Sequence, residues 1–205
     1  MNKTHISILS SVVVGALITG IPALAGQTAP SKFTADPDKT MAAAHESFVK
    51  GDTKAAADGI AQAADYVKKQ SAKVADDSKE GMKRAGDELA KLGEGVKNGT
   101  VKSEGELKKT FAKVDHEMAT CWHKTAESSQ KAGKDSTAAL KKAGSALQNS
   151  AKWSGHQVSE GAKASMSAMK KAGKATGEGA KAGTEEVNKW FKGIGDGIED
   201  LGKKL

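Results

Sequence analysis

The stretch KGDTKAAADGIAQAADYV, residues 50–67, contains a helix boundary followed by the start of an amphipathic pattern. Glycine commonly ends a helix and Asp or Thr commonly caps the next one, so Gly51-Asp52-Thr53 predicts a tight turn between two helices. After the turn, small or apolar residues recur at steps of three or four: Ile60, Ala63, Val67, Ser71, Val74, Ser78, Met82, Ala85, Leu89, Leu92 and Val96. Thirty-six residues in ten steps average 3.6 residues per step, which predicts one long straight helix ending at Asn98-Gly99-Thr100.

Helix signals flank this stripe on both sides. Asp36-Pro37 combines an N-cap with a proline at the first helical position, and it predicts a helix that continues to Lys50. The apolar face of that helix comprises Met41, Ala44 and Phe48. Ser103 and Glu106 have the spacing of a capping box and predict the start of another helix. Its apolar face comprises Leu107, Phe111, Val114, Met118, Cys121 and Thr125.

A second turn, Gly133-Lys134-Asp135-Ser136, precedes a fourth helical stretch, whose apolar or small positions are Leu140, Leu147, Ala151, Val158, Ala162, Met169 and Ala180. Leu147, Val158, Met169, Ala180 and Phe191 are eleven residues apart, a repeat near 3.67 residues per turn. This spacing predicts one long helix that need not supercoil left-handed, with a break near residue 183.

The composition favours an all-α fold. Leu, Ile, Val and Phe together supply 22 of the 180 residues after position 25, and no stretch there alternates β-branched with polar residues as strands do. Such a core must be built from alanine with scattered large residues, which suits closely packed helices of marginal stability. We therefore expect an elongated bundle of long amphipathic helices, divided into residues 36–131 and 132–205.

An internal duplication is suggested by similar segments about 80 residues apart. KGDTKAAADGIAQAA at 50–64 parallels GKDSTAALKKAGSAL at 133–147, SAKV at 71–74 parallels SAKW at 150–153, and EGMK at 80–83 parallels EGAK at 160–163. Each unit would be a helix, a tight Gly/Asp turn and a longer helix.

The pattern H-x-x-x-x-K-G-D-x-x-x-A-A-x-x-I-x-x-A-A-x-Y-V, from His45 to Val67, resembles one hairpin of a tetratricopeptide-type repeat. It is also similar to the single hairpin of the YfdX family of small exported bacterial proteins. No 34-residue period recurs, which argues against a tetratricopeptide array. The eleven-residue Ala/Lys/Gly pattern of the second half resembles late-embryogenesis-abundant and apolipoprotein-like helices. None of these resemblances supplies a functional residue.

The N-terminus indicates export. Residues 1–25 carry Lys3, an apolar stretch from Ile6 to Ile21, and Ala23-Leu24-Ala25, which is the pattern of a secretory signal peptide cleaved near Ala25. A periplasmic or extracellular protein is expected, with a flexible mature segment at 26–35. Loss of Lys3 reduces the net charge from +7 to +6, and Arg84 is the only arginine. Export and the scarcity of arginine argue against a nucleic-acid partner.

The segment HEMATCWHK, residues 116–124, raises the question of a metal or haem site. On a helix, His116 and His123 lie opposite the apolar face and about 10 Å apart along the axis, too far to bind one ion by themselves. A polar helix face is the simpler interpretation. The alternative is a shared site completed by His45 or His156 from another helix, which would bind copper, zinc or haem iron. No resident cofactor is otherwise expected.

The sequence shows no catalytic pattern. Cys121 lies on the apolar face, so a buried, inert thiol is favoured over an intermolecular disulfide, and His123 projects away from it. No glycine-rich phosphate loop or Ser/His/Asp pattern occurs, and the carboxylates are mostly interleaved with lysines. We therefore expect a protein that is not an enzyme.

The most amphipathic segment is TEEVNKWFKGIGDGIEDLGKKL, residues 184–205. Its apolar face comprises Val187, Trp190, Phe191, Ile194, Ile198, Leu201 and Leu205. This face either docks on the bundle or lies at a membrane surface, where Trp and Phe beside lysines suit the headgroup boundary. Two functions follow: an exported structural or interaction protein, with a stress-protective or holding role, that binds another protein or its own copies through helix faces, or a reversible lipid-surface binder.

Overall fold

The computed structural model describes residues 36–175 and 184–205, which form seven α-helices and no strand. The helices are α1 (Pro37–Val49), α2 (Thr53–Gln70), α3 (Lys79–Lys97), α4 (Glu104–Lys131), α5 (Thr137–Ser154), α6 (Glu160–Ala175) and α7 (Thr184–Gly202). Two short 3₁₀ turns, Ser71–Lys73 and Asp76–Ser78, join α2 to α3. The all-α prediction is confirmed, and none of the described helices is long and apolar enough to cross a membrane.

The predicted starts of α1, α2 and α4 are confirmed by side-chain caps. The Asp36 carboxylate accepts hydrogen bonds from the backbone N–H groups of Asp38 and Lys39, and Asp52 accepts one from Ala55. The capping box at the start of α4 is complete. The Ser103 hydroxyl accepts a hydrogen bond from the Glu106 N–H, and the Glu106 carboxylate accepts one from the Ser103 N–H. The chain reverses at Gly51, Gly99 and Gly133, whose φ angles are 79°, 69° and 67°, a left-handed conformation in which glycine is unstrained. Local signals therefore determine these boundaries.

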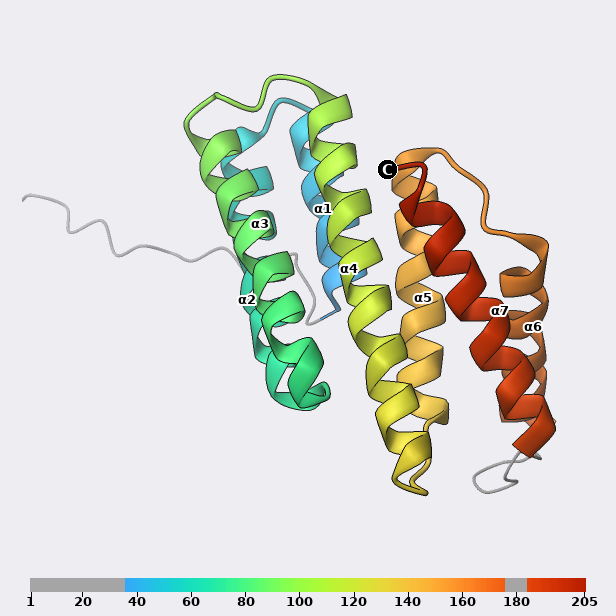
Figure 1. The fold of residues 1–205 in the computed structure, drawn as a ribbon. Helices are drawn as coiled ribbons and strands as arrows, with labels where there is room; N and C mark the ends of the chain where they lie inside the picture. The colour runs from blue at the N-terminus through green and yellow to red at the C-terminus, as the bar shows by residue number, and fades with distance from the viewer. Residues whose placement is uncertain (1–35, 176–183) are drawn as a thin grey trace, which may run out of the picture. The chain divides into compact units, whose positions relative to one another are not determined.

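The prediction of one helix from Ile60 to Val96 is wrong. The chain leaves the helix after Gln70 and folds back, with extended backbone at Val74 (ψ 163°) between the two 3₁₀ turns. α2 and α3 then pack as an antiparallel hairpin (Figure 1). A straight helix would leave its sparse apolar stripe exposed, whereas the hairpin buries the two halves against each other. Ser71, Val74 and Ser78 keep the helical spacing through the turn, which is why periodicity did not reveal it.

Glycines allow the close approach of α2 and α3. A Cβ at Gly86 would lie 2.5 Å from Lys68 Cγ and 3.2 Å from the Ala64 carbonyl oxygen. A Cβ at Gly93 would lie 3.4 Å from Ile60 Cγ2. The backbones of α2 and α3 therefore lie close together at these glycines. This close packing compensates for the small number of large side chains between the two helices.

The fourth helical stretch is also divided. α5 ends at Gly155, which has a φ of 74°, and α6 begins at Glu160. Leu147, Val158 and Met169 are nevertheless buried, so the eleven-residue spacing marks inward positions on both sides of the loop. Ala180 and the predicted break near 183 fall outside the described residues. Each predicted unit was to end in one long helix, and this prediction is wrong, because both long helices are divided in two.

The two segments that suggested a duplication form similar successions of helices and turns in the structure. In each half a helix ends at a positive-φ glycine and an 18-residue helix follows, α2 or α5. A short non-helical connection then leads to α3 or α6, near the Glu-Gly pairs at 80–81 and 160–161. The predicted boundary at 131–132 coincides with the turn between α4 and α5. Common descent of the halves stays a prediction.

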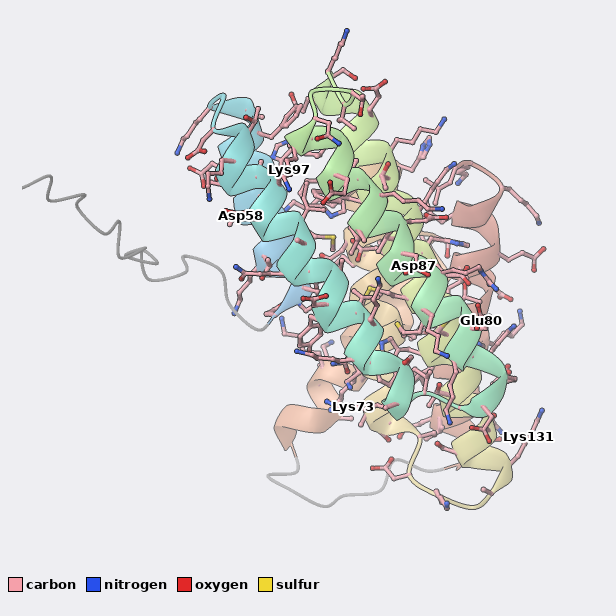
Figure 2. All side chains as sticks on the ribbon, turned by 90° about the vertical axis from the view of Figure 1, so that its left-hand side faces the viewer. Asp58, Lys73, Glu80, Asp87, Lys97 and Lys131 are labelled. Carbon is pink, nitrogen blue, oxygen red and sulfur yellow. The ribbon has the colours of Figure 1, made fainter. Side chains whose placement is uncertain are left out.

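The described helices share one hydrophobic core. α4 and α5 lie side by side, α3 packs against α4 on one side, and α7 packs against α4, α5 and α6 on the other (Figure 1). The largest fully buried side chains include Met41, Ile60, Met82, Leu89, Leu107, Phe111, Leu140, Leu147, Ile194 and Leu201. Among the described residues Val49 is the one large hydrophobic side chain that is exposed, at 59%. The outer side of α2 and α3 carries charged side chains instead, including Asp58 and Asp87 (Figure 2).

Candidate functional site

His116 and His123 bind α7 and do not form a solvated polar face. The ring Nε2–H of His116 donates to the Ile198 carbonyl oxygen at 2.9 Å, and that of His123 donates to the Phe191 carbonyl oxygen at 3.1 Å. The two histidines are seven residues apart on α4, and the two carbonyl groups are seven residues apart on α7. The earlier histidine contacts the later carbonyl, so the two helices run antiparallel. The sequence interpretation of a polar helix face is wrong, because both rings are partly buried in a helix–helix contact.

Two glycines of α7 make room for these rings. A Cβ at Gly195 would lie 3.2 Å from the His123 ring, and one at Gly202 would lie 2.8 Å from His116 Nε2. On its other side α7 approaches α6, where a Cβ at Gly197 would lie 2.6 Å from Ala162 Cβ. The glycines of this amphipathic segment thus have a packing role on two neighbouring helices.

The structure does not bring the four candidate histidines together. His45 Nε2 lies 3.0 Å from Glu104 Oε1, and its ring centroid lies 5.4 Å from that of Trp153. This hydrogen bond is the largest cause of the lowered pKa of Glu104. His156 is exposed in the loop after α5. No group of three or more His, Cys, Asp or Glu side chains within the described residues could hold a metal ion.

The apolar face of residues 184–205 is docked. Trp190, Phe191, Ile194, Ile198 and Leu201 are buried against the bundle, and Val187 and Leu205 are partly buried against it. Cys121 is also buried, and burial, followed by the charge of Glu117, raises the pKa of its thiol to about 12. The prediction of a buried cysteine is confirmed.

Sequence reasoning missed Asp115, a carboxylate in the core. Its side chain is fully buried, and neither oxygen accepts a well-formed hydrogen bond from the described residues. Burial is the main cause that raises its pKa well above the ordinary value; the charge of Asp38 adds to this, and Trp153 partly opposes it. Phe111, Asp115, Met118 and Trp122 form a row at spacings of four, three and four. An aspartate at helical spacing among these large apolar residues was the feature of the sequence that could have revealed a buried acid.

Asp38, at the start of α1, is the less buried member of this acidic pair. One of its oxygens is buried without a hydrogen-bond partner. Burial is the largest cause of its raised pKa, the charge of Asp36 contributes, and a hydrogen bond from Asn149 of α5 opposes the shift. Two carboxyl groups placed so near each other in a buried position favour retention of a proton, and the more deeply buried Asp115 is the group that retains it.

Asp38 opens onto a groove of about 590 Å³ between α1, α2, α4 and α5. The groove is lined by Asp36, Pro37, Asp38, Tyr66, Gln70, Met118, Trp122, Lys141, Lys142, Ser145 and Ala146. The Lys142 ammonium lies 3.9 Å from the centroid of the Trp122 ring, a cation–π contact. Burial and, second, the charge of Lys73 lower the pKa of Lys142. Lys73 lies at the turn that joins α2 to α3 (Figure 2).

The two ends of the groove carry opposite charges. On α4, Asp115 and Trp122 are seven residues apart, and on α5, Asn149 and Lys142 are seven residues apart. Seven residues correspond to about 10 Å along a helix. The carboxyl pair beside Asn149 and the ammonium above Trp122 are therefore separated by two helical turns. The groove has an acidic end and a basic end, with aromatic and apolar side chains between them.

These charges lack ion-pair partners among the described residues. Several exposed carboxylates elsewhere are paired with lysines, such as Asp58 with Lys54 at 2.7 Å. In residues 36–175 and 184–205, by contrast, no ion pair involves the Lys141 or Lys142 ammonium or either carboxyl group of the acidic pair. The groove therefore combines unpaired charges of both signs with a concave surface.

Comparisons with protein-family models, curated proteins and solved structures gave no match. The resemblances to a YfdX-type hairpin and to late-embryogenesis-abundant helices therefore stay predictions, and a function has to be argued from the groove itself.

Proposed function

We propose that the chain is an exported, non-enzymatic helical protein that works by binding a small soluble ligand in the groove. The observation that carries the proposal is the concentration of unpaired charge around a concave surface, Asp38 at one end and Lys142 at the other. A volume of about 590 Å³ lies within the range typical of small-molecule pockets. Export rests on the sequence of residues 1–25, which lie outside the described residues.

The groove is better supported than the helix faces as the place of binding. A holding protein or a lipid-surface binder needs an apolar surface to offer, and in the described helices the apolar faces are packed against each other. The face of α7 would have to leave α4, α5 and α6 before it could reach a membrane or a partner. The groove needs no such rearrangement.

Binding without catalysis is the simpler use of this lining. The described groove contains no histidine or cysteine that could act as base or nucleophile, and Cys121 is a buried thiol of high pKa. Its charged groups lie about two helical turns apart, which suits the holding of two ends of a ligand better than concerted action on one bond.

A groove-filling variant tests the proposal. Ser145 is exposed on α5 and lines the groove, so Ser145→Trp should occupy it without disturbing the core. Ser167→Trp, at an exposed position of α6, is the matched control. We expect charged small molecules that raise the melting temperature of the native protein and of the control to have no effect on Ser145→Trp. Equal shifts in all three proteins, or no shift with any of a broad set of charged metabolites, would refute a groove-binding function.

A further inference from the structure

The acidic end of the groove lacks a positive group. Asp38 lines the groove and receives a hydrogen bond from Asn149, while one of its oxygens is buried without a partner. Asp115 lies behind it, fully buried, and neither of its oxygens accepts a well-formed hydrogen bond from the described residues. Asp115 belongs to the same face of α4 as Met118 and Trp122, which line the groove. An ammonium group that reaches Asp38 brings a positive charge to a place where no described side chain supplies one, and it adds hydrogen-bond donors to the one from Asn149.

The basic end lacks a negative group. Lys141 and Lys142 line the groove, and Lys73 is near enough for its charge to disfavour protonation of Lys142. The Trp122 ring holds the Lys142 ammonium at 3.9 Å but does not neutralise it. A carboxylate placed here would pair with Lys141 and Lys142 and offset the effect of the Lys73 charge on Lys142.

One ligand that carries both charges satisfies both ends. A cation alone would leave the ammonium of Lys142 beside the charge of Lys73 without an anion, and an anion alone would leave Asp38 without a positive partner. Between the ends, Tyr66, Met118, Trp122 and Ala146 offer apolar surface that suits a short chain of methylene groups. The separation of about 10 Å along the helices sets the approximate reach, which the lysine side chain can shorten.

We propose that the groove binds a small zwitterion, with its ammonium at Asp38 and its carboxylate at Lys142. This inference rests on the proposed function and adds the chemical class of the ligand. Asp115, which retains its proton, leaves the negative charge of this end on Asp38 and does not itself contact the ligand.

Calorimetric titration with 6-aminohexanoate tests the inference on the purified full chain. Hexanoate and hexylammonium, which each keep one charge and the same methylene chain, are the matched probes. We expect 6-aminohexanoate to bind at least tenfold more tightly than either. A series from 4-aminobutanoate to 8-aminooctanoate should show an optimum length, because the two ends of the groove are fixed on helices.

Two variants assign the ends. Asp38→Asn should reduce the affinity for 6-aminohexanoate to that for hexanoate and leave hexanoate binding unchanged. Lys142→Gln should reduce it to the affinity for hexylammonium. Lys97→Gln, an exposed lysine at the end of α3 (Figure 2), should change neither. Circular dichroism of each variant checks that the helices are retained.

The result separates the inference from the function on which it rests. If hexanoate or hexylammonium binds as tightly as 6-aminohexanoate, or if none of the amino acids binds, the zwitterion inference is overturned. The proposed function is refuted by a different result, namely that no ligand of any charge raises the melting temperature of the native protein more than that of Ser145→Trp.

Discussion

Replacement of Asp115 by asparagine should stabilise the protein, which is an unusual expectation for a core substitution. The carboxylate is fully buried, neither oxygen accepts a well-formed hydrogen bond from the described residues, and Trp153 only partly opposes the rise of its pKa. Asparagine has nearly the same shape, carries no charge and can donate a hydrogen bond to Asp38. A buried polar group without a partner costs about 1–3 kcal/mol. We therefore expect Asp115→Asn to raise the free energy of unfolding by about 1–3 kcal/mol at neutral to alkaline pH.

The gain should depend on pH in a defined direction. Burial raises the folded-state pKa of Asp115, so the folded chain retains a proton that the unfolded chain has already lost. The native protein therefore loses stability as the pH rises from the ordinary aspartate pKa through the raised folded-state pKa. Asparagine has no such proton. The advantage of Asp115→Asn should consequently be small near pH 4 and largest near pH 8.

Urea unfolding followed by circular dichroism at about pH 4 and about pH 8 measures this difference. A gain of 1 kcal/mol corresponds to roughly 2–4 °C in melting temperature for a chain of this size. Asp65→Asn, at an exposed position of α2, is the matched control and should change stability by less than about 0.5 kcal/mol. A variant that is less stable than the native protein at pH 8 would show that Asp115 is ionised and partnered, and the argument for an acidic pair would be wrong.

Three further predictions test the packing of α7 and the burial of Cys121. Gly195→Val should destabilise the protein by about 1–3 kcal/mol, because its Cβ would press on the His123 ring; Gly161→Val, which meets nothing within 4 Å, controls for helix propensity, so equal losses in urea unfolding would refute the close contact. Deletion of residues 184–205 should lower the melting temperature and leave liposome binding in a flotation assay unchanged, since the apolar face is docked; loss of lipid binding with stability intact would favour the membrane role. Cys121 should resist an aromatic disulfide reagent at pH 8 in the native protein and react fully in urea, because its thiol is buried and has a pKa of about 12; rapid native reaction would contradict its burial.

Local chemistry explains which parts of the fold could be predicted. The starts of α1, α2 and α4 depend on a cap residue and its neighbours within four positions, and the turns at residues 51, 99 and 133 need a backbone conformation that glycine adopts most easily. Such signals lie wholly within a short stretch of chain. The buried faces of α4 and α7 were also predictable, because a stripe at helical spacing has one side to bury wherever the helix packs.

Two helix breaks were missed for a different reason. Ser71, Val74 and Ser78 keep the spacing of three and four through the turn, and Leu147 and Val158 keep a spacing of eleven across Gly155. In a chain so rich in alanine, lysine and glycine, local preference for helix is similar at many positions. Burial against another helix decides whether the chain continues or reverses.

The sequence by itself determined the caps of α1, α2 and α4, the glycine turns and the apolar faces, because these depend on residues a few positions apart. The tertiary structure alone decided the candidate site. His116 and His123 became helix-docking groups because α7 lies against them, and Asp115 became a buried acid because α1 and α5 close over it. The charges of Asp38 and Lys142 were left without ion-pair partners by the packing of four helices from distant parts of the chain. A carboxylate or an imidazole looks the same in a sequence wherever it lies, and its role depends on the solvent, charge and neighbours that folding brings to it.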